Sequence, residues 1–487
     1  MCINPPAVGS RVTLSAAAVL ACALVVGSAS GGPPGRWSAL AEGSGLGASA
    51  QEVGVARTPD GVLHVAWKQD TGPLSSVIRV RSITRTGTVG PEVTAVSGYG
   101  LAGDPALLAA GGALRLFFPA GAPTEGMLTS TAPAAGSPWS APGLVTNEQL
   151  ARARTPAVTL APDGTPLQTW YGSGIVVHRG LAPGGAQTLP ASGTEARPNI
   201  ATDAAGHVWV VWCRFGGSGP VGTIAQRVDP ASGAPVGSQI QLPGSSTEFQ
   251  GTQNALCVLD ATVARNEPLA ARVGGGVYAA GTTGYPKRTG VLVWRLDASG
   301  VARTLTVAST RKPAHLGYND PAVAAAPDGR VWVAWVERDG RTTKIVARRS
   351  NHAGTAFGAA VQATPPGGIS TAAVNLAAQA DRTDLIGLVQ SSSGALSIQH
   401  TQLWPGLTLV RGGSTRRGRR GVVLSFRALD AGEPVGGVRV RVAGKSAVTA
   451  KNGVAKLPFR RSAKKQRATA SATRSGYVGA RLSFACC

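Results

Sequence analysis

A repeated motif constrains this 487-residue chain more than any other feature. In each copy a short apolar run is followed by a Pro-Asp-Gly-type turn and then by a second apolar run that ends on Trp. Pro presets φ, Asp hydrogen-bonds its own backbone and Gly adopts positive φ, so the motif predicts two antiparallel strands joined by a tight turn. The clearest copies span 53–67, 156–170, 198–212 and 321–335.

Weaker copies begin near residues 104, 257 and 375, and all the copies together have a mean step of about 54 residues. A third strand follows in most units, and then a Gly and a looser fourth strand. Four short antiparallel strands in a unit of this length form the blade of a β-propeller. We therefore predict an all-β propeller over 32–405. Seven blades are favoured, and six are the alternative if 257–320 is one irregular insertion.

The N-terminal end of this region predicts how the ring closes. Residues 37–40 (WSAL) are similar to 139–142 (WSAP), which form the outer strand before the third unit. We expect the first segment to supply the fourth strand of the last blade, because that pairing leaves no free sheet edge. Trp at a fixed register in the blades is interpreted as core packing rather than as a set of sugar-stacking platforms.

The repeat resembles the sialidase-like propellers of the Asp-box (BNR) type found in secreted bacterial proteins, over roughly residues 35–405. The nearest match to their S-x-D-x-G-x-T-W box is 350–357, which keeps Ser350, Gly354 and the aromatic Phe357 but lacks the Asp and the Thr. In a catalytic sialidase the resemblance implies three carboxylate-binding arginines, a Tyr–Glu nucleophile pair and an Asp acid/base. The early Arg-Ile-Pro strand is missing here, and no Tyr has an obvious Glu partner. We therefore expect no sialidase catalysis.

The composition changes near residue 405. Residues 406–421 are basic and rich in Gly and Arg, and are predicted to be a linker. Residues 422–487 alternate as short strands and contain Gly432-Glu433-Pro434-Val435 and Asn452-Gly453, so they resemble small β-sandwich modules of the carboxypeptidase-regulatory-like or bacterial Ig-like kind. Residues 406–487 hold 18 Lys and Arg against two acids, so most of the formal charge of +23 belongs to this part of the chain.

Charged and polar residues stand at the starts of several predicted inner strands, and the symmetry of a propeller would gather them at one mouth of the central channel. They form either a polar ligand-binding rim or a set of solvated residues that cap the strands. Asp104 and Asp320 are the candidate pair for acid/base catalysis. The rim candidates are Glu52, Asp104, Arg154, Arg197, Asn319 and Asp320.

Cysteine and histidine usage predicts neither a metal site nor a cofactor. Cys213 and Cys257 either pair as a disulfide between neighbouring units or remain two small buried side chains. The state of Cys486 and Cys487 is not fixed by the sequence. The six His have no metal-binding spacing, and no phosphate-binding or dinucleotide motif occurs.

Residues 1–31 have the pattern of a secretory signal peptide, with Arg11, an apolar run that ends at Val26 and a small-residue exit. The alternative is a lipoprotein signal cleaved before Cys22. We expect a monomeric secreted or cell-surface protein without a transmembrane helix. Export, and a linker without aromatic residues for base stacking, argue against a nucleic-acid partner.

These observations favour a non-catalytic binding or scaffold protein. Its propeller would be the recognition platform, for example for carbohydrate. Its basic C-terminal module would hold it to an anionic polymer or surface. The alternative is a sialidase-like glycoside hydrolase or a lyase that acts at the channel mouth.

Overall fold

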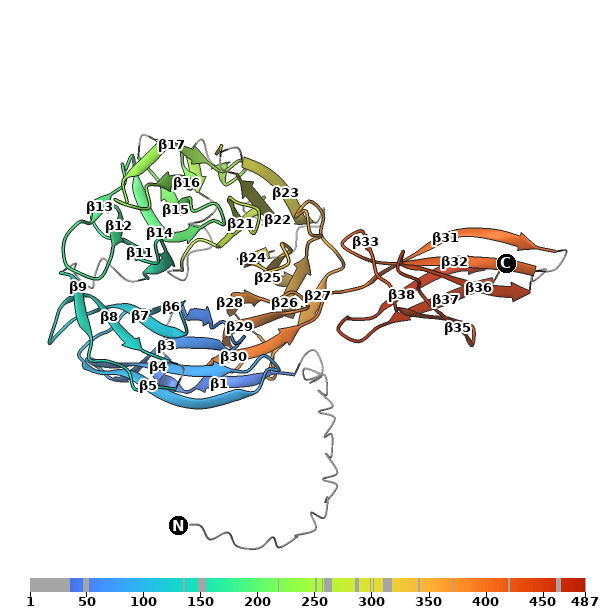
Figure 1. Ribbon diagram of the computed structural model, residues 1–487, viewed down its shortest axis with the longest axis horizontal. Coiled ribbons are helices and arrows are strands. Elements are labelled where there is room, and N and C mark those ends of the chain that lie inside the picture. Colours follow the sequence, from blue (N-terminus) through green and yellow to red (C-terminus); the bar gives the residue numbers. More distant parts are fainter. Residues whose placement is uncertain are drawn as a thin grey trace, which may run out of the picture.

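The structure of the chain is a computed structural model (Figure 1). A ring of sheets built from strands β1–β30 carries an elongated pair of sheets built from β31–β38 (Figure 1). The structure describes residues 36–46, 52–134, 136–147, 155–217, 219–249, 252–255, 257, 265–284, 289–297, 299–300, 302–309, 318–339, 342–369, 371–418, 421–460 and 466–486.

Seven four-stranded antiparallel sheets make up the ring in the described part of residues 36–403. Six of them run outward in chain order from an inner strand at the central channel, and the seventh runs β28-β29-β30-β1, which is the architecture of a β-propeller. The first three sheets are β2–β5 (Gly54–Arg57, Leu63–Gly72, Ser75–Ile83, Val89–Tyr99), β6–β9 (Ala106–Ala110, Ala113–Ala120, Gly126–Ala132, Gly143–Thr146) and β10–β13 (Ala157–Leu160, Pro166–Tyr171, Ile175–Arg179, Gln187–Thr188).

The second half of the ring repeats this arrangement and adds the hairpin β18–β19 (Ser246–Phe249, Thr252–Ala255). A short 3-10 helix, η1 (Ser44–Leu46), follows the first strand. The remaining sheets are β14–β17 (Thr194–Thr202, Val208–Phe215, Gly222–Val228, Pro235–Gln241), β20–β23 (Leu269–Ala271, Val277–Thr283, Gly290–Leu296, Ala302–Ser309), β24–β27 (Tyr318–Ala325, Val331–Asp339, Thr342–Arg349, Val361–Ala363) and β28–β30 (Thr371–Ala378, Thr383–Gln390, Leu396–Leu403) with β1 (Ser38–Glu42).

The predicted closure of the ring by the N-terminal segment is confirmed. Strand β1 pairs antiparallel with β30, so the first described strand is the fourth strand of the last sheet. A polar contact supports the same junction on the inner side. Arg57 of β2 donates a 2.6 Å bond to Asp384 of β29, and Asp384 also accepts a 2.9 Å bond from His400 when Nε2 of that ring carries the proton.

The tryptophans pack in the core of the sheets, as the register predicts. Trp67, Trp170, Trp212 and Trp335 are all less than 2 % exposed, and each lies in a cluster of buried apolar side chains. Inner strands also approach closely: a Cβ on Gly54 of β2 would lie 2.8 Å from the carbonyl oxygen of Pro105, which precedes β6. Burial of this apolar surface stabilises the ring by roughly 25 cal/mol per Å².

The repeated Asp residues form turns, as predicted. In each one the side-chain Oδ1 accepts a hydrogen bond from the backbone N–H two residues later, at 2.9–3.2 Å. This bond holds the Asx-type turn between the first two strands. The four residues are Asp60, Asp163, Asp203 and Asp328.

The C-terminal part is a β-sandwich of two four-stranded sheets around one apolar core, in which Phe426 and Val440 are fully buried. One sheet orders β31 (Thr408–Arg417), β32 (Gly421–Asp430) and β33 (Glu433–Pro434), with β36 (Val454–Arg460) on the other side of β32. The second orders β35 (Lys445–Val448), β34 (Arg439–Val442), β37 (Gln466–Thr473) and β38 (Ala480–Cys486).

The linker predicted over 406–421 is wrong. Most of it is strand β31, which pairs with β32 along its length. Leu407 and Leu409 enter the sandwich core, whereas Arg411 and Arg416 are exposed. The Gly412-Gly413 pair falls where the β31 register shifts, so these glycines belong to an irregularity in a strand rather than to a flexible spacer. Within the described residues, no helix is long and apolar enough to cross a membrane.

Candidate functional site

A cavity of about 190 Å³ lies in the central channel of the propeller. The seven ring sheets all contribute to its wall, each through its inner strand or the residues just before it. Both polar and apolar residues line it, and the apolar ones include Val55 of β2, Val158 of β10 and Val323 of β24. The channel is thus the place where residues from distant repeats meet.

Four residues cross this cavity. Residues 265–268, which we call the crossing segment, precede β20 and contact the inner strands of several other sheets. Arg265 donates bonds of 2.6 Å to the carbonyl oxygen of Val374 and 3.0 Å to Oδ1 of Asn375, and its Nε lies 3.4 Å from Oε2 of Glu52. Asn266 donates from its side chain to the carbonyl oxygen of Pro156 at 3.1 Å. The segment therefore ties three sheets together across the channel.

Glu267 anchors the crossing segment on a fourth sheet. Its carboxylate lies 3.3 Å from Nε of Arg197 and accepts a 3.3 Å bond from Thr223. Its carbonyl oxygen accepts a 2.7 Å bond from the side chain of Asn199. Burial raises the pKa of Glu267, while the Arg197 charge and the Thr223 hydroxyl oppose that rise. The result is a buried carboxyl group with raised proton affinity beside the channel cavity.

Arg197 is the hub between the crossing segment and the disulfide. Cys213 and Cys257 are joined by a disulfide with a Cα–Cα distance of 5.8 Å. Arg197 donates to the carbonyl oxygens of Cys257 at 2.5 Å and Arg265 at 2.9 Å. Its φ of 58° is uncommon for a residue with a side chain, and such conformations persist where the surroundings fix them. Here the two side-chain bonds and a 2.9 Å bond from the N–H of Glu267 to the Arg197 carbonyl oxygen hold it in place.

The structure brings together three of the rim candidates. The backbone N–H of Glu52 donates a 3.1 Å bond to Oδ2 of Asp104, and Arg197 joins them through the crossing segment. Glu52 and Asp104 are buried and the side chain of Arg197 is 10% exposed, so the alternative that they are solvated residues is wrong for them. Arg154 lies outside the described residues. Asn319 and Asp320 lie in the backbone of β24, but their side chains are outside what the structure describes, and so the Asp104–Asp320 pair stays a prediction.

Asn199, Arg265, Glu267 and Asn375 belong to this mouth but were not predicted from the sequence. The unit expected to begin near 257 has its inner strand at Leu269–Ala271, after the crossing segment. An Arg-Asn-Glu-Pro run inside an irregular stretch gives no local signal of what it contacts. Asn375 was visible at the start of an inner strand, and its position there was the one usable clue. It donates a 2.6 Å bond to Oε1 of Glu52.

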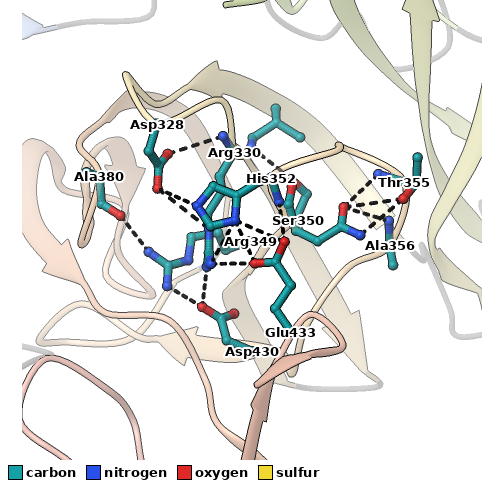
Figure 2. Close-up of polar contacts among 12 residues, drawn as sticks. Asp328, Arg330, Arg349, Ser350, His352, Thr355, Ala356, Ala380, Asp430 and Glu433 are labelled. Atoms are coloured by element: carbon teal, nitrogen blue, oxygen red, sulfur yellow. Dashed lines mark hydrogen bonds and ion pairs between the residues drawn. The ribbon is translucent and has the colours of Figure 1, made fainter. Parts of the chain in front are cut away.

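A second polar cluster joins the propeller to the sandwich (Figure 2). Arg330, which precedes β25, reaches Asp430 at the end of β32 and lies 2.6 Å from Oε2 of Glu433 in β33. Arg349, the last residue of β26, also pairs with Asp430. His352 places Nδ1 2.8 Å from Oε2 of Glu433. We call these five residues the clamp.

The clamp is partly buried, so each of its charged groups is stabilised by a neighbour of opposite charge rather than by water. The side chain of Asp430 is 1 % exposed, and that of Arg349 is 4 % exposed. Burial raises the pKa of Glu433, but the hydrogen bonds from His352 and the charge of Arg330 outweigh it and hold this pKa below its ordinary value. Around the clamp, Arg349 stacks 5.8 Å from the ring centre of Tyr477. The chain connection is ordered too, since the N–H of Leu407 bonds the carbonyl oxygen of Val478 at 3.0 Å.

The clamp also separates charge within the molecule. Asp430 and Glu433 are the two acids of residues 406–487, and both face propeller cations. The Lys and Arg residues of the sandwich whose side chains the structure describes are all exposed. They are Arg411, Arg416, Arg427, Arg439, Arg441, Lys445, Lys451, Lys456, Arg460, Arg467, Arg474 and Arg481. The outward surface of the sandwich is therefore basic and carries no described carboxylate.

No protein-family model matches the chain, and no curated protein matches it. Solved structures do resemble it. A Dyadobacter fermentans protein of unknown function is 13% identical with a TM-score of 0.46, over 77% of this chain and 99% of that one. The polysaccharide lyase Uly1 is 11% identical with a TM-score of 0.42, over 72% and 89%. The α-L-arabinofuranosidase Arb93A of Fusarium graminearum is 11% identical with a TM-score of 0.40, over 73% and 93%.

These likenesses are distant, and the propeller fold of this chain follows from its own strand pairing. No comparison supports the Asp-box sialidase type or the Ig-like type for the two parts of the chain, so these resemblances remain predictions.

Proposed function

We propose that this chain is an exported, non-catalytic binding protein whose propeller is held on an anionic polymer by the basic sandwich. This proposal is based on where the charges of the sandwich lie. Both of its acids face propeller arginines, and the charged side chains described on its exposed surface are Lys and Arg. Such a surface attracts polyanions by a long-range interaction that salt screens. Residues 1–31 would direct export, by either form of leader described above.

The arrangement at the channel mouth supports the non-catalytic part of the proposal. A glycosidase needs one carboxyl group to protonate the leaving oxygen and another to attack or to activate water. Glu52 is bonded to Asn375 and paired with Arg265, and Glu267 is paired with Arg197. These partners belong to the chain itself, and the crossing segment that supplies two of these residues lines the channel cavity.

The test is retention of the full chain on dextran sulfate resin. We expect elution to require several hundred millimolar NaCl, because each phosphate- or sulfate-like contact releases counterions and makes binding fall steeply with salt. Passage through the column at 50 mM NaCl would overturn the proposal. Propeller recognition of carbohydrate is tested separately, by titration of neutral oligosaccharides against the channel.

A second candidate function is hydrolysis of a glycoside at the channel mouth, and the observation that favours it is Glu267. A buried carboxyl with a raised pKa suits a general acid, and the cavity of about 190 Å³ adjoins it. A panel of fluorogenic glycosides tests this reading. Turnover that disappears in Glu267→Gln but persists in Glu337→Gln, a partly exposed carboxylate on β25, would establish it, and a silent panel would remove it.

A further inference from the structure

One face of the sandwich concentrates its arginines. In β34 the burial alternates, so that Val440 and Val442 enter the core while Arg439 and Arg441 point outward. The neighbouring strands β37 and β38 alternate in the same way and present Arg467 and Arg481 on the exposed side. We call the outward side of the sheet β35-β34-β37-β38 the basic face.

Strand register fixes how these arginines lie relative to one another. Arg441 pairs with Ser471, and Ser471 pairs with Arg481, so the two arginines flank a serine in one row across three strands. Arg439 lies two residues from Arg441 and opposite Thr473. The groups between the arginines are thus small hydroxyl side chains, which can donate to or accept from a ligand oxygen.

The four arginines of the basic face, Arg439, Arg441, Arg467 and Arg481, have side chains that are available to a ligand. Within the described residues, none of them donates a hydrogen bond to another group of the protein or forms an ion pair. Arg330 and Arg349 differ from them, because both form ion pairs with Asp430 inside the clamp. Guanidinium groups bind carboxylates in a bidentate way when nothing else engages them.

The spacing on the basic face suits a polymer with separated charges. Adjacent strands lie about 4.8 Å apart, so Arg441 and Arg481 are about 10 Å apart across the sheet, and Arg439 and Arg441 are about 7 Å apart along the strand. Duplex DNA has one charge per about 1.7 Å, which is much denser. The described outward side chains of β34, β37 and β38 include no aromatic ring on which a nucleic-acid base could stack.

We infer that the basic face binds a linear acidic polysaccharide that carries about one carboxylate every 7–10 Å. The arginines engage the carboxylates, and Ser471 and Thr473 bond the sugar hydroxyls between them. This inference rests on the proposed function and deepens it, since it names the anionic partner and the surface that holds it. Propeller and sandwich would then be presented on the polymer as one clamped unit.

The experiment measures binding of the full chain to polygalacturonate at 50 mM NaCl, with a 25-bp DNA duplex and phosphatidylglycerol vesicles as rival probes. The face variant is R439Q/R441Q/R467Q/R481Q. The control variant is R427Q/K451Q/K456Q/R460Q, which removes the same charge from exposed positions elsewhere on the sandwich. We expect the face variant to weaken polygalacturonate binding at least tenfold and to reduce its salt dependence, and the control to stay within threefold. Unchanged thermal unfolding establishes that both variants fold.

Equal weakening by the two variants would overturn the inference, because charge alone would then explain binding. Tighter binding of DNA or vesicles than of polygalacturonate, lost in the face variant, would overturn the choice of partner. Both outcomes leave retention on dextran sulfate intact. Failure of the unaltered chain to bind dextran sulfate is the different result that overturns the proposed function itself.

Discussion

Arg349, the last residue of propeller strand β26, forms an ion pair with Asp430, the last residue of sandwich strand β32. Arg330 pairs with the same carboxylate, so one buried acid contacts two cations from the other part of the molecule, and Glu433 supplies the second negative charge. Removing one partner of a buried pair costs more than forming the pair gains, because a charge is left without compensation. The junction therefore depends on Asp430.

Substitution Asp430→Asn is expected to destabilise the docked molecule by about 3–5 kcal/mol, since the Arg349 guanidinium stays buried without a counter-ion while Arg330 keeps the more exposed Glu433. Urea unfolding with tryptophan fluorescence measures the change. The matched control is Glu433→Gln, whose side chain is 31% exposed and whose loss is expected to cost about 1 kcal/mol or less. Equal losses from the two substitutions would contradict this account of the clamp.

Asp384 makes the ring closure sensitive to acid. Burial raises its pKa, but the hydrogen bond and charge of His400 and the charge of Arg57 outweigh burial and lower the pKa from 3.8 to about 2. A carboxyl whose folded-state pKa is depressed stabilises the fold above its unfolded pKa and loses that contribution as pH falls toward the folded value. We expect a loss of about 2 kcal/mol between pH 5 and pH 2 from this group.

Urea unfolding at pH 7, 5, 3 and 2 checks this loss. The Asp384→Asn variant is expected to be less stable at pH 7 and to lose less between pH 5 and pH 2. Asp381→Asn is the control, because that side chain lies near the same turn but is 58% exposed. If the Asp384→Asn variant loses as much unfolding free energy between pH 5 and pH 2 as the unaltered chain, then other carboxyl groups cause the loss.

The repeat made the propeller predictable because each unit repeats the same local rules. An apolar strand, an Asp-containing turn and a buried Trp such as Trp212 or Trp335 can be recognised within 15 residues, and closure by β1 could be inferred from one similar outer strand. The repeats fix the register, so copies with a weak motif still fall into place.

The channel mouth and the clamp were not predictable in this way. Arg265 contacts Glu52 and Asn375, but these residues are brought together only when the ring is closed. Asp430 and Glu433 lie on either side of an ordinary turn between β32 and β33, and their partners Arg330 and Arg349 stand just before β25 and at the end of β26. Long-range pairing of single residues leaves no period in a sequence, so it needs the structure.

The disulfide is expected to stabilise the fold by joining β15 of the fourth ring sheet to Cys257. Cys213 and Cys257 are 44 residues apart, and a cross-link of that loop contributes about 3–4 kcal/mol in the chain-entropy account. Reductant should therefore lower the urea midpoint of the unaltered chain, and Cys213→Ser with Cys257→Ser should lower it as much. Reductant should leave the doubly substituted chain unchanged. Thiol titration establishes when reduction is complete. A urea midpoint that is unaltered at that point would refute this expectation.

Arg265 and Glu52 are expected to behave as a coupled pair at the channel mouth. Arg265→Met leaves the carboxylate of Glu52 buried without its cation and is expected to cost about 3–5 kcal/mol. Glu52→Gln alone should also destabilise, because it leaves Arg265 without its counter-ion. The double variant has no unpaired charge, so its loss should be smaller than the sum by about 1–3 kcal/mol in a double-mutant cycle of urea unfolding. An additive cycle would mean that Asn375 and the Val374 carbonyl hold Arg265 in place without Glu52. The crossing segment would then be positioned by hydrogen bonds to the last sheet rather than by charge.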